Sequence, residues 1–99
     1  MVTVITRLRV KDGREAEWDE VFEKRVEAAR EQEGFQFVQL CRPEDAPRDR
    51  VIVGTWSSHE NWSAWHDEPE FVRTRDELED VEAGSSESRW YEVVVEGRR

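Results

Sequence analysis

The stretch TWSSHENWSAWHDEPEF, residues 55–71, leads from a strand into a pair of helices and contains three of the chain's five tryptophans and both of its histidines. Ser57 stands three residues before Glu60, which is the spacing of a capping box, so the pattern predicts that Ser57 caps a helix. Proline suits the first turn of a helix and not its interior, so Pro69 predicts a break near residues 67–68. A second helix is then expected over residues 69–78.

The segments before this stretch alternate between strand and helix patterns. Residues 2–10, VTVITRLRV, alternate between two faces and predict a strand, followed by a turn at residues 11–13. Residues 14–33 place apolar side chains at helical spacing, which predicts an amphipathic helix with Gly34 as its C-terminal cap. Strands are expected over residues 35–42 and 51–56, joined by the charged, proline-containing loop 42–50.

The final segment RWYEVVVEG, residues 89–97, predicts the last strand after a loop over residues 81–88. The order strand, helix, strand, strand, helix pair, strand is that of an α+β, ferredoxin-like βαββαβ fold. In this fold the helices cover one face of a four-stranded antiparallel sheet. We expect a single domain over residues 1–99, because the length and an apolar fraction of 36% suit one lean core.

The predicted sheet is apolar on both faces. Apolar residues oppose one another in three strands: Phe35 and Phe37 against Val38 and Leu40, Val51 and Val53 against Ile52 and Trp56, and Tyr91, Val93 and Val95 against Trp90 and Val94. A sheet that is apolar on both sides must be covered on both, and the helices of one chain cover only one. We therefore expect a homodimer in which the sheet of a second copy covers the other face.

The acidic composition limits the classes of partner. Asp and Glu number 24 against 15 Lys and Arg, and the net charge of -9 would repel the phosphate backbone of nucleic acids and anionic lipid. No apolar run approaches the roughly 20 residues of a membrane span, and the first residues lack the pattern of a signal peptide. We expect no nucleic acid or membrane partner and a cytoplasmic protein. Cys41 has no metal-ligand spacing around it and is expected to be a buried strand residue.

His59, Trp62 and His66 fall at i, i+3 and i+7 of the first helix in residues 55–71, so they share one side, with Trp65 on the adjoining flank. Two interpretations are open. Trp62, Trp65 and Phe71 pack as a core-facing aromatic stripe, or the edge formed by Trp65 and His66 is the wall of a pocket. The histidines lie two turns apart, about 10 Å, which is too far to chelate one ion, so no metal site is predicted.

Two segments carry a specific likeness to a known family: GFQFVQLCRP, residues 34–43, and VGTWSSHENWSAWHDEPEF, residues 53–71. With these segments the whole chain resembles the antibiotic biosynthesis monooxygenase family, a group of small dimeric α/β-barrel proteins. The resemblance implies the ferredoxin-like fold and a homodimeric α/β barrel. Because members of the family differ in chemistry, the motif alone does not identify the reaction.

One branch of this family consists of cofactor-free monooxygenases that oxidise polycyclic phenols to quinones, in which the deprotonated substrate itself reduces dioxygen. Such chemistry needs an apolar pocket, a group that takes the phenol proton, and little water. The resemblance implies no cofactor and a small phenol- or quinol-like ligand. The catalytic candidates are His66 as base, Trp65 and Arg75, with Tyr91 as another holder of an oxyanion. The candidate substrate contacts are Thr6, Phe37, Trp56, Trp62 and Tyr91.

A second branch, the haem-degrading monooxygenases, uses an asparagine, a tryptophan and a haem-ligating histidine. The tryptophan carries over onto Trp65, but the other two positions fall on Thr6 and Arg75, and arginine cannot ligate iron because it stays protonated. Haem is the alternative cofactor. In that case His59 or His66 would replace the missing ligand. A third interpretation is a non-catalytic small-molecule-binding or stress-associated barrel.

Overall fold

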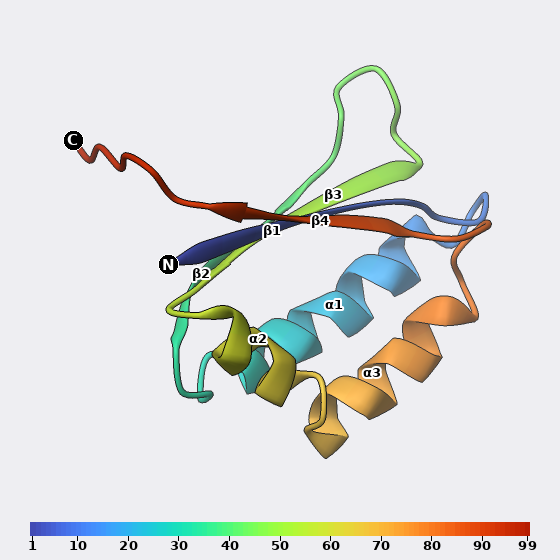
Figure 1. Cartoon of the computed structure of the whole chain (residues 1–99). Helices are drawn as coiled ribbons and strands as arrows, with labels where there is room; N and C mark the ends of the chain where they lie inside the picture. Colours follow the sequence, from blue (N-terminus) through green and yellow to red (C-terminus); the bar gives the residue numbers. More distant parts are fainter.

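The computed structural model describes residues 1–99 as one layer of helices on one face of a sheet (Figure 1). The elements follow in the order β1 (Val2–Arg9), α1 (Glu15–Ala29), β2 (Phe35–Cys41), β3 (Asp49–Trp56), α2 (His59–Trp65), α3 (Pro69–Glu79) and β4 (Glu87–Glu92). The strands form an antiparallel sheet in the order β2-β3-β1-β4. The expected ferredoxin-like βαββαβ fold is confirmed. None of the helices combines the length and the apolar character needed to cross a bilayer.

Strand β1 lies inside the sheet, between β3 and β4, and sets the faces of both neighbours. The register pairs Val4 with Gly54 of β3 and with Trp90 of β4. Because successive strand side chains point to opposite faces, Val4 and Thr6 lie on the helix-facing side together with these partners. Val4 is buried, whereas the smaller and polar Thr6 is only half-buried.

The helices and the sheet enclose two hydrophobic clusters rather than one. The first cluster consists of Leu8, Val10, Trp18, Phe22, Leu78 and Val81, and the second of Val2, Ala29, Trp56, Trp65 and Phe71. Helix α1 contributes Trp18 and Phe22 to the first cluster and Ala29 to the second. The apolar stripe predicted for this helix is therefore the face that packs on the sheet.

Helix α1 ends at Ala29 rather than near residue 33, and Gly34 is not its cap. A turn segment follows the helix, and Gly34 then adopts a φ of +86° at the start of β2. A Cβ at Gly34 would overlap the side chain of Asn61 in α2. The Gly34 carbonyl accepts a hydrogen bond from the Ser57 amide at 2.7 Å. Glycine suits this position because both the positive φ and the close approach exclude a side chain.

Helix α2 begins one residue later than predicted, and its N-cap is Ser58 instead of Ser57. The Ser58 hydroxyl oxygen accepts a hydrogen bond from the Asn61 amide at 3.1 Å, which satisfies a free donor of the first turn. Ser57 instead accepts a hydrogen bond from the side chain of Gln36 at 2.6 Å. The break before Pro69 is confirmed, because Pro69 is the first residue of α3.

A bulge in β2 places Phe35 and Phe37 on opposite faces, which corrects the expectation that they share one. The register shifts between them, so that Phe35 pairs with Trp56 and Phe37 with Thr55. Phe35 therefore packs edge-on against Trp56 in the second cluster. The prediction that Cys41 is buried is also wrong. Cys41 is exposed because it lies on the face away from the helices, at the outermost strand of the sheet.

Strand β4 runs over residues 87–92, so the prediction of a strand over residues 89–97 starts too late and ends too late. Residues 87 and 88 already pair with β1, and Glu92 pairs with Val2. The Val93 amide donates to the Met1 carbonyl at 3.2 Å, and β1 offers no further partner. The tail therefore leaves the sheet (Figure 1), with Val94 and Val95 largely exposed.

We predict that Asp19→Asn lowers the free energy of unfolding by about 2 kcal/mol, because the buried guanidinium of Arg50 loses its charged partner. Arg50 of β3 is 3% exposed and donates to the Asp19 carboxylate of α1 at 2.7 and 3.0 Å. Urea denaturation measures the change, with Glu20→Gln at an exposed position of the same helix as control. A loss as small as that of the control would contradict a structural role for this pair.

Candidate functional site

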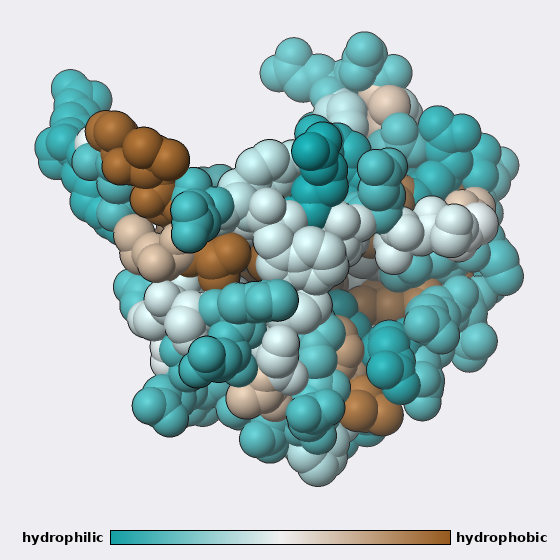
Figure 2. Space-filling model, viewed as in Figure 1, coloured by the Kyte–Doolittle hydropathy of each residue, from teal (hydrophilic) through white to brown (hydrophobic).

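A cavity of about 350 Å³ lies between the sheet and the helices, and residues of both hydrophobic clusters line it. The space exists because helix-facing positions on three neighbouring strands carry small side chains: Thr6, Gly54 and Ser88. A Cβ on Gly54 would meet only ordinary contacts, at 3.8 Å from Val38 and 3.9 Å from Trp56. Figure 2 shows this side of the molecule hollowed below β4.

Aromatic side chains form one end of the cavity. Trp56 and Trp65 stack with ring centroids 6.4 Å apart, and Phe71 meets Trp65 edge-on at 5.6 Å. Near the surface, the half-buried Trp62 packs edge-on against Trp90 of β4 at 5.2 Å, and 46% of Trp90 is exposed. Trp65 and Phe71 thus belong to the core and also line the cavity, so the two interpretations of the aromatic stripe are compatible.

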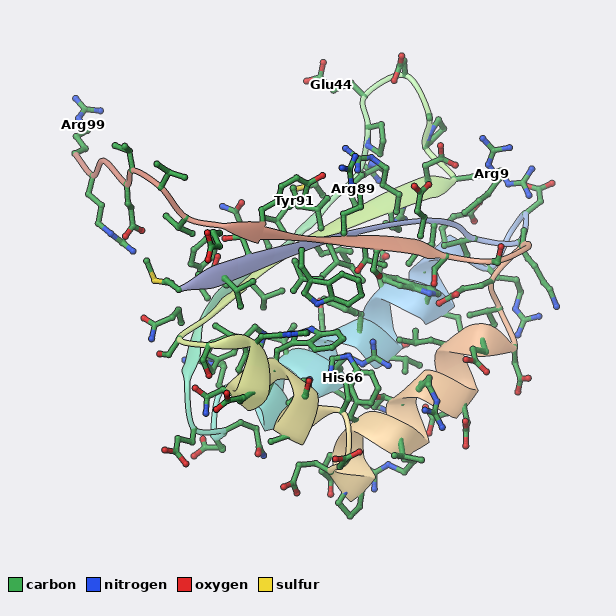
Figure 3. All side chains as sticks on the ribbon, in the orientation of Figure 1. Arg9, Glu44, His66, Arg89, Tyr91 and Arg99 are labelled. Carbon is green, nitrogen blue, oxygen red and sulfur yellow. The ribbon has the colours of Figure 1, made fainter.

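His66 follows α2 directly and points into the space between the sheet and the helices (Figure 3). Its ring lies between Trp62 and Phe71, with centroid distances of 3.7 and 4.0 Å. His66 Nδ1 lies 2.8 Å from the Trp62 carbonyl oxygen. Since a carbonyl only accepts, Nδ1 carries the proton, and the neutral ring keeps a lone pair on Nε2.

Burial lowers the pKa of His66 below its ordinary value of 6.5, and the positive charges of Arg25 and Arg75 add to this effect, while the Trp62 carbonyl opposes it. The ring is therefore neutral at pH 7 and able to accept a proton. His59 shares the same side of α2, as predicted, and stacks on Trp62 at 5.5 Å, but it is exposed and does not line the cavity.

Charged residues form the other end of the cavity. Arg25 of α1 donates from Nε to the Thr74 hydroxyl at 3.0 Å, and burial lowers its pKa to about 10. The Trp18 indole donates to the Glu82 carboxylate at 3.0 Å, and burial raises the pKa of Glu82 in spite of this bond. No group of three or more His, Cys, Asp and Glu side chains is close enough to share a metal ion.

Thr6 and Arg75 both line the cavity. The Thr6 hydroxyl lies 2.9 Å from that of Ser88, its partner across the β1–β4 ladder, so Thr6 faces the cavity while bonded to a neighbouring strand. Arg75 of α3 is exposed, and its Nε lies 3.6 Å from the Asp76 carboxylate. An exposed pair of this kind is weak, so the Arg75 guanidinium is free to turn toward a ligand.

Two of the candidate residues, Phe37 and Tyr91, lie away from the cavity. Both occupy strand positions whose side chains point to the face opposite the helices, and Tyr91 stands on that face in Figure 3. The residue before Tyr91 in the chain, Trp90, lines the cavity instead. Strand alternation predicts that Trp90 and Tyr91 lie on opposite faces of the sheet. Only the register of β4 on β1 shows that Trp90 is the one on the cavity side.

Arg25, Glu79 and Glu82 are charged cavity residues that the sequence did not predict. In the sequence, Arg25 lies within a run of charged residues on an amphipathic helix, a pattern typical of solvated positions. Its position immediately before Val26, on the edge of the apolar stripe, is the one signal that it lies near the core. Glu82 follows α3 and reaches the cavity only because the chain there returns to the sheet.

Comparison with known proteins places this geometry among related folds. The family described as antibiotic biosynthesis monooxygenase matches residues 1–77. No curated protein sequence matches the chain.

Solved structures share the fold at low sequence identity. The chain is similar to SnoaB from Streptomyces nogalater, described as a cofactor-independent oxygenase, with a TM-score of 0.86, 24% identity, and coverage of 96% of this chain and 94% of SnoaB. It is also similar to Rv0793 from Mycobacterium tuberculosis, with a TM-score of 0.88, 13% identity, and coverage of 98% of each chain. A conserved protein from Methanosarcina mazei Go1 gives a TM-score of 0.87 at 14% identity, covering 91% of this chain and 89% of that one. At these identities the likeness concerns the fold.

We predict that His66 makes the protein less stable as the pH falls below 6.5. Because the folded state lowers the pKa of His66, the unfolded chain binds more protons in this range, and stability rises with pH through it. The difference in unfolding free energy between the wild type and His66→Gln is therefore larger at pH 7.5 than at pH 5. Urea titrations at both pH values measure it.

Glu82 affects the pH dependence of stability in the opposite direction. Because its pKa is raised in the folded state, the stability that protonated Glu82 contributes is lost as the pH rises above the ordinary pKa of glutamate. Both proteins share this effect, so it cancels in the difference. His59→Gln, which replaces the other histidine at an exposed position, is the matched control. Parallel curves for the wild type and His66→Gln would contradict the prediction.

Proposed function

Because the chain belongs to the antibiotic biosynthesis monooxygenase family, we propose that it is a cofactor-independent monooxygenase that oxidises a small phenol- or quinol-like aromatic metabolite with dioxygen. The observation that carries this proposal is a neutral, half-buried histidine, His66, on the aromatic wall of a cavity. Without a cofactor, the reaction requires a base to generate an electron-rich anion from the substrate, and His66 is suited to that step.

The cavity suits a flat aromatic substrate. Its volume of about 350 Å³ falls within the range of small-molecule sites, and Trp56, Trp65 and Phe71 on its aromatic wall are buried. A substrate ring that packs against Trp65 and Trp56 makes apolar and ring-stacking contacts there. Removal of water from this end keeps the reactive anion from being reprotonated by solvent.

His66 acts first, by accepting the phenolic proton on Nε2. The hydrogen bond from Nδ1 to the Trp62 carbonyl fixes the tautomer and the orientation of the ring, as a base requires. Its lowered pKa keeps Nε2 unprotonated at neutral pH. Arg75, at the edge of the cavity, stabilises the negative charge that develops on the substrate oxygen.

Electrons then pass from the substrate anion to dioxygen. A new C–O bond forms at a ring carbon that bore hydrogen, and the O–O bond breaks. One oxygen atom becomes the second carbonyl of the quinone, and the other leaves as water with the two protons that the phenol lost. The substrate gives up four electrons and dioxygen accepts four, so no external reductant is needed.

We also propose that the open face of the sheet joins two copies of the chain. The side chains on this face include Thr3, Ile5, Phe37, Val51, Val53 and Tyr91, as the strand register requires. No helix of the same chain covers them (Figure 1). An apolar sheet face of this kind is normally covered, and a second copy presents a surface of the same chemistry.

For the reaction, we predict that His66→Gln lowers kcat/KM about 100-fold in oxygen-uptake assays with a phenolic substrate such as a naphthol, because glutamine is no base. His59→Gln, the other histidine, retains wild-type activity. For the wild type, kcat/KM rises with pH with a midpoint below pH 6.5, since the base must be neutral and its pKa is lowered from that value. Full activity of His66→Gln would contradict the proposed role.

Cofactor independence is tested in the same assay. We predict that dialysis against a chelator leaves oxygen uptake unchanged, and that haemin titration gives no saturable Soret band. A saturable band that is lost in His66→Gln and bleached by ascorbate would instead favour the haem alternative. Ligand binding without any oxygen uptake would favour the non-catalytic alternative.

For the dimer, we predict that light scattering gives twice the 11.8 kDa mass of one chain at micromolar concentration. Val53→Glu places a charge in the centre of the open face and yields a monomer, because an unpaired charge is costly to bury. Ala16→Glu adds the same charge at an exposed position of α1 and leaves the dimer intact. A wild-type protein that is monomeric would contradict this proposal.

A further inference from the structure

Arg25 is a cation inside the cavity that no carboxylate of the protein neutralises directly. Its guanidinium packs over the Phe71 ring, with Cζ 4.3 Å from the centroid, and its Nε is bonded to the Thr74 hydroxyl at 3.0 Å. None of the ion pairs of the protein includes Arg25. Burial of a charge that forms no ion pair costs free energy, so a position of this kind is typical of a functional site.

The position of the guanidinium is fixed, and its outer edge remains available. Thr74 is itself held by bonds from its hydroxyl to the Phe71 and Glu70 carbonyls, both at 3.0 Å. Once Nε is bonded to Thr74, the N–H groups on the two Nη atoms are the remaining donors of Arg25. The Nη atoms have no hydrogen-bond partner within the protein, and every buried polar side-chain atom does have one. The Nη atoms are therefore accessible to solvent or to a ligand.

The carboxylates at this end of the cavity form no hydrogen bond to Arg25. Glu82 receives the Trp18 indole N–H instead of a bond from Arg25, and Glu79 of α3 is exposed. Both carboxylates line the cavity and act on Arg25 through their charge, without a hydrogen bond to it. The protein as a whole carries a net charge of -9, so its general field repels anions. Attraction of an anion into this cavity therefore depends on the two arginines that line it, Arg25 and Arg75, of which only Arg25 is held in place by a hydrogen bond from its Nε.

We propose that Arg25 is the specificity-determining residue of the cavity, and that it binds a carboxylate carried by the aromatic substrate. The two Nη atoms form a planar fork that matches the two oxygens of a carboxylate, and the substrate ring extends from there toward the tryptophan wall. The substrate is then an aromatic carboxylic acid whose phenolic oxygen reaches His66. This inference rests on the proposed function in taking the cavity as the substrate site and His66 as the base.

The test is equilibrium binding of two probes that differ in charge and share one ring system, 2-naphthoate and 2-naphthamide, measured by calorimetry at pH 7.5. The wild type is expected to bind the naphthoate about tenfold more tightly, because hydrogen bonds to a charged group are the stronger ones. In Arg25→Gln this preference disappears, while the affinity for the naphthamide stays within about threefold of the wild type. Arg25→Lys keeps the charge without the planar fork and retains part of the preference.

Arg73→Gln is the matched control, since Arg73 is an exposed arginine on α3 that does not line the cavity, and it keeps the full preference. Thermal denaturation by circular dichroism checks that each variant is folded, and Arg25→Lys decides the question if Arg25→Gln is not. The inference is overturned if the wild type binds the two probes equally or binds neither. It is also overturned if folded Arg25 variants keep the full preference, or if Arg75→Gln abolishes it while Arg25→Gln does not.

Binding and turnover give separate answers. A charge preference that depends on Arg25, together with no oxygen uptake, would support the carboxylate site and contradict the proposed monooxygenase. Oxygen uptake that depends on His66, together with equal binding of the two probes, would overturn the carboxylate site alone.

Discussion

The hydrogen-bonded ladder of β1 with β3 and β4 sets which side chains of the sheet face the helices. It places Val4 beside Gly54 and Trp90, and Thr6 beside Ser88, on the side that the helices cover. A shift by one residue would turn all of these side chains to the other face. The same register that builds the core therefore also decides which side chains are small enough to leave a cavity.

The cavity places small and polar residues where a small domain would ordinarily have apolar core residues. A fold of 99 residues has few apolar side chains to spare, yet its helix-facing sheet carries a glycine and two hydroxyl residues at the centre. The neighbouring helices add a histidine and an arginine whose charged forms burial disfavours. Burial of titratable groups is unfavourable and is concentrated at functional sites, so the burial of His66 and Arg25 identifies the cavity as the candidate site.

The aromatic residues have two tasks that are hard to separate by mutation. Trp65 and Phe71 hold α2 and α3 against the sheet as members of a core cluster, and they also line the cavity. Their truncation would change stability and ligand binding together. His66 and Arg25 are better probes of function, because they contribute chemistry at the cavity surface while the aromatic residues keep the helices in place.

Local patterns in the sequence account for the elements, the break at Pro69, the helix stripe that contains Trp18 and Phe22, and the two apolar faces of the sheet. They also carry the family resemblance and select His66, because spacing along a helix is a short-range property. The errors come from longer-range effects. The bulge that separates Phe35 from Phe37 depends on the pairing of β2 with β3, and the end of β4 depends on where β1 begins.

The order of strands and helices, and the sets of side chains that share a face within each element, follow from the amino-acid sequence alone. The reason is that neighbouring residues in a strand or helix point in directions set by the local backbone. The tertiary structure alone decided that Trp90 and not Tyr91 lines the cavity, and that Arg25 enters it beside Phe71. These outcomes depend on strand register and on how α1 packs against α3, and both join residues that are far apart in the chain.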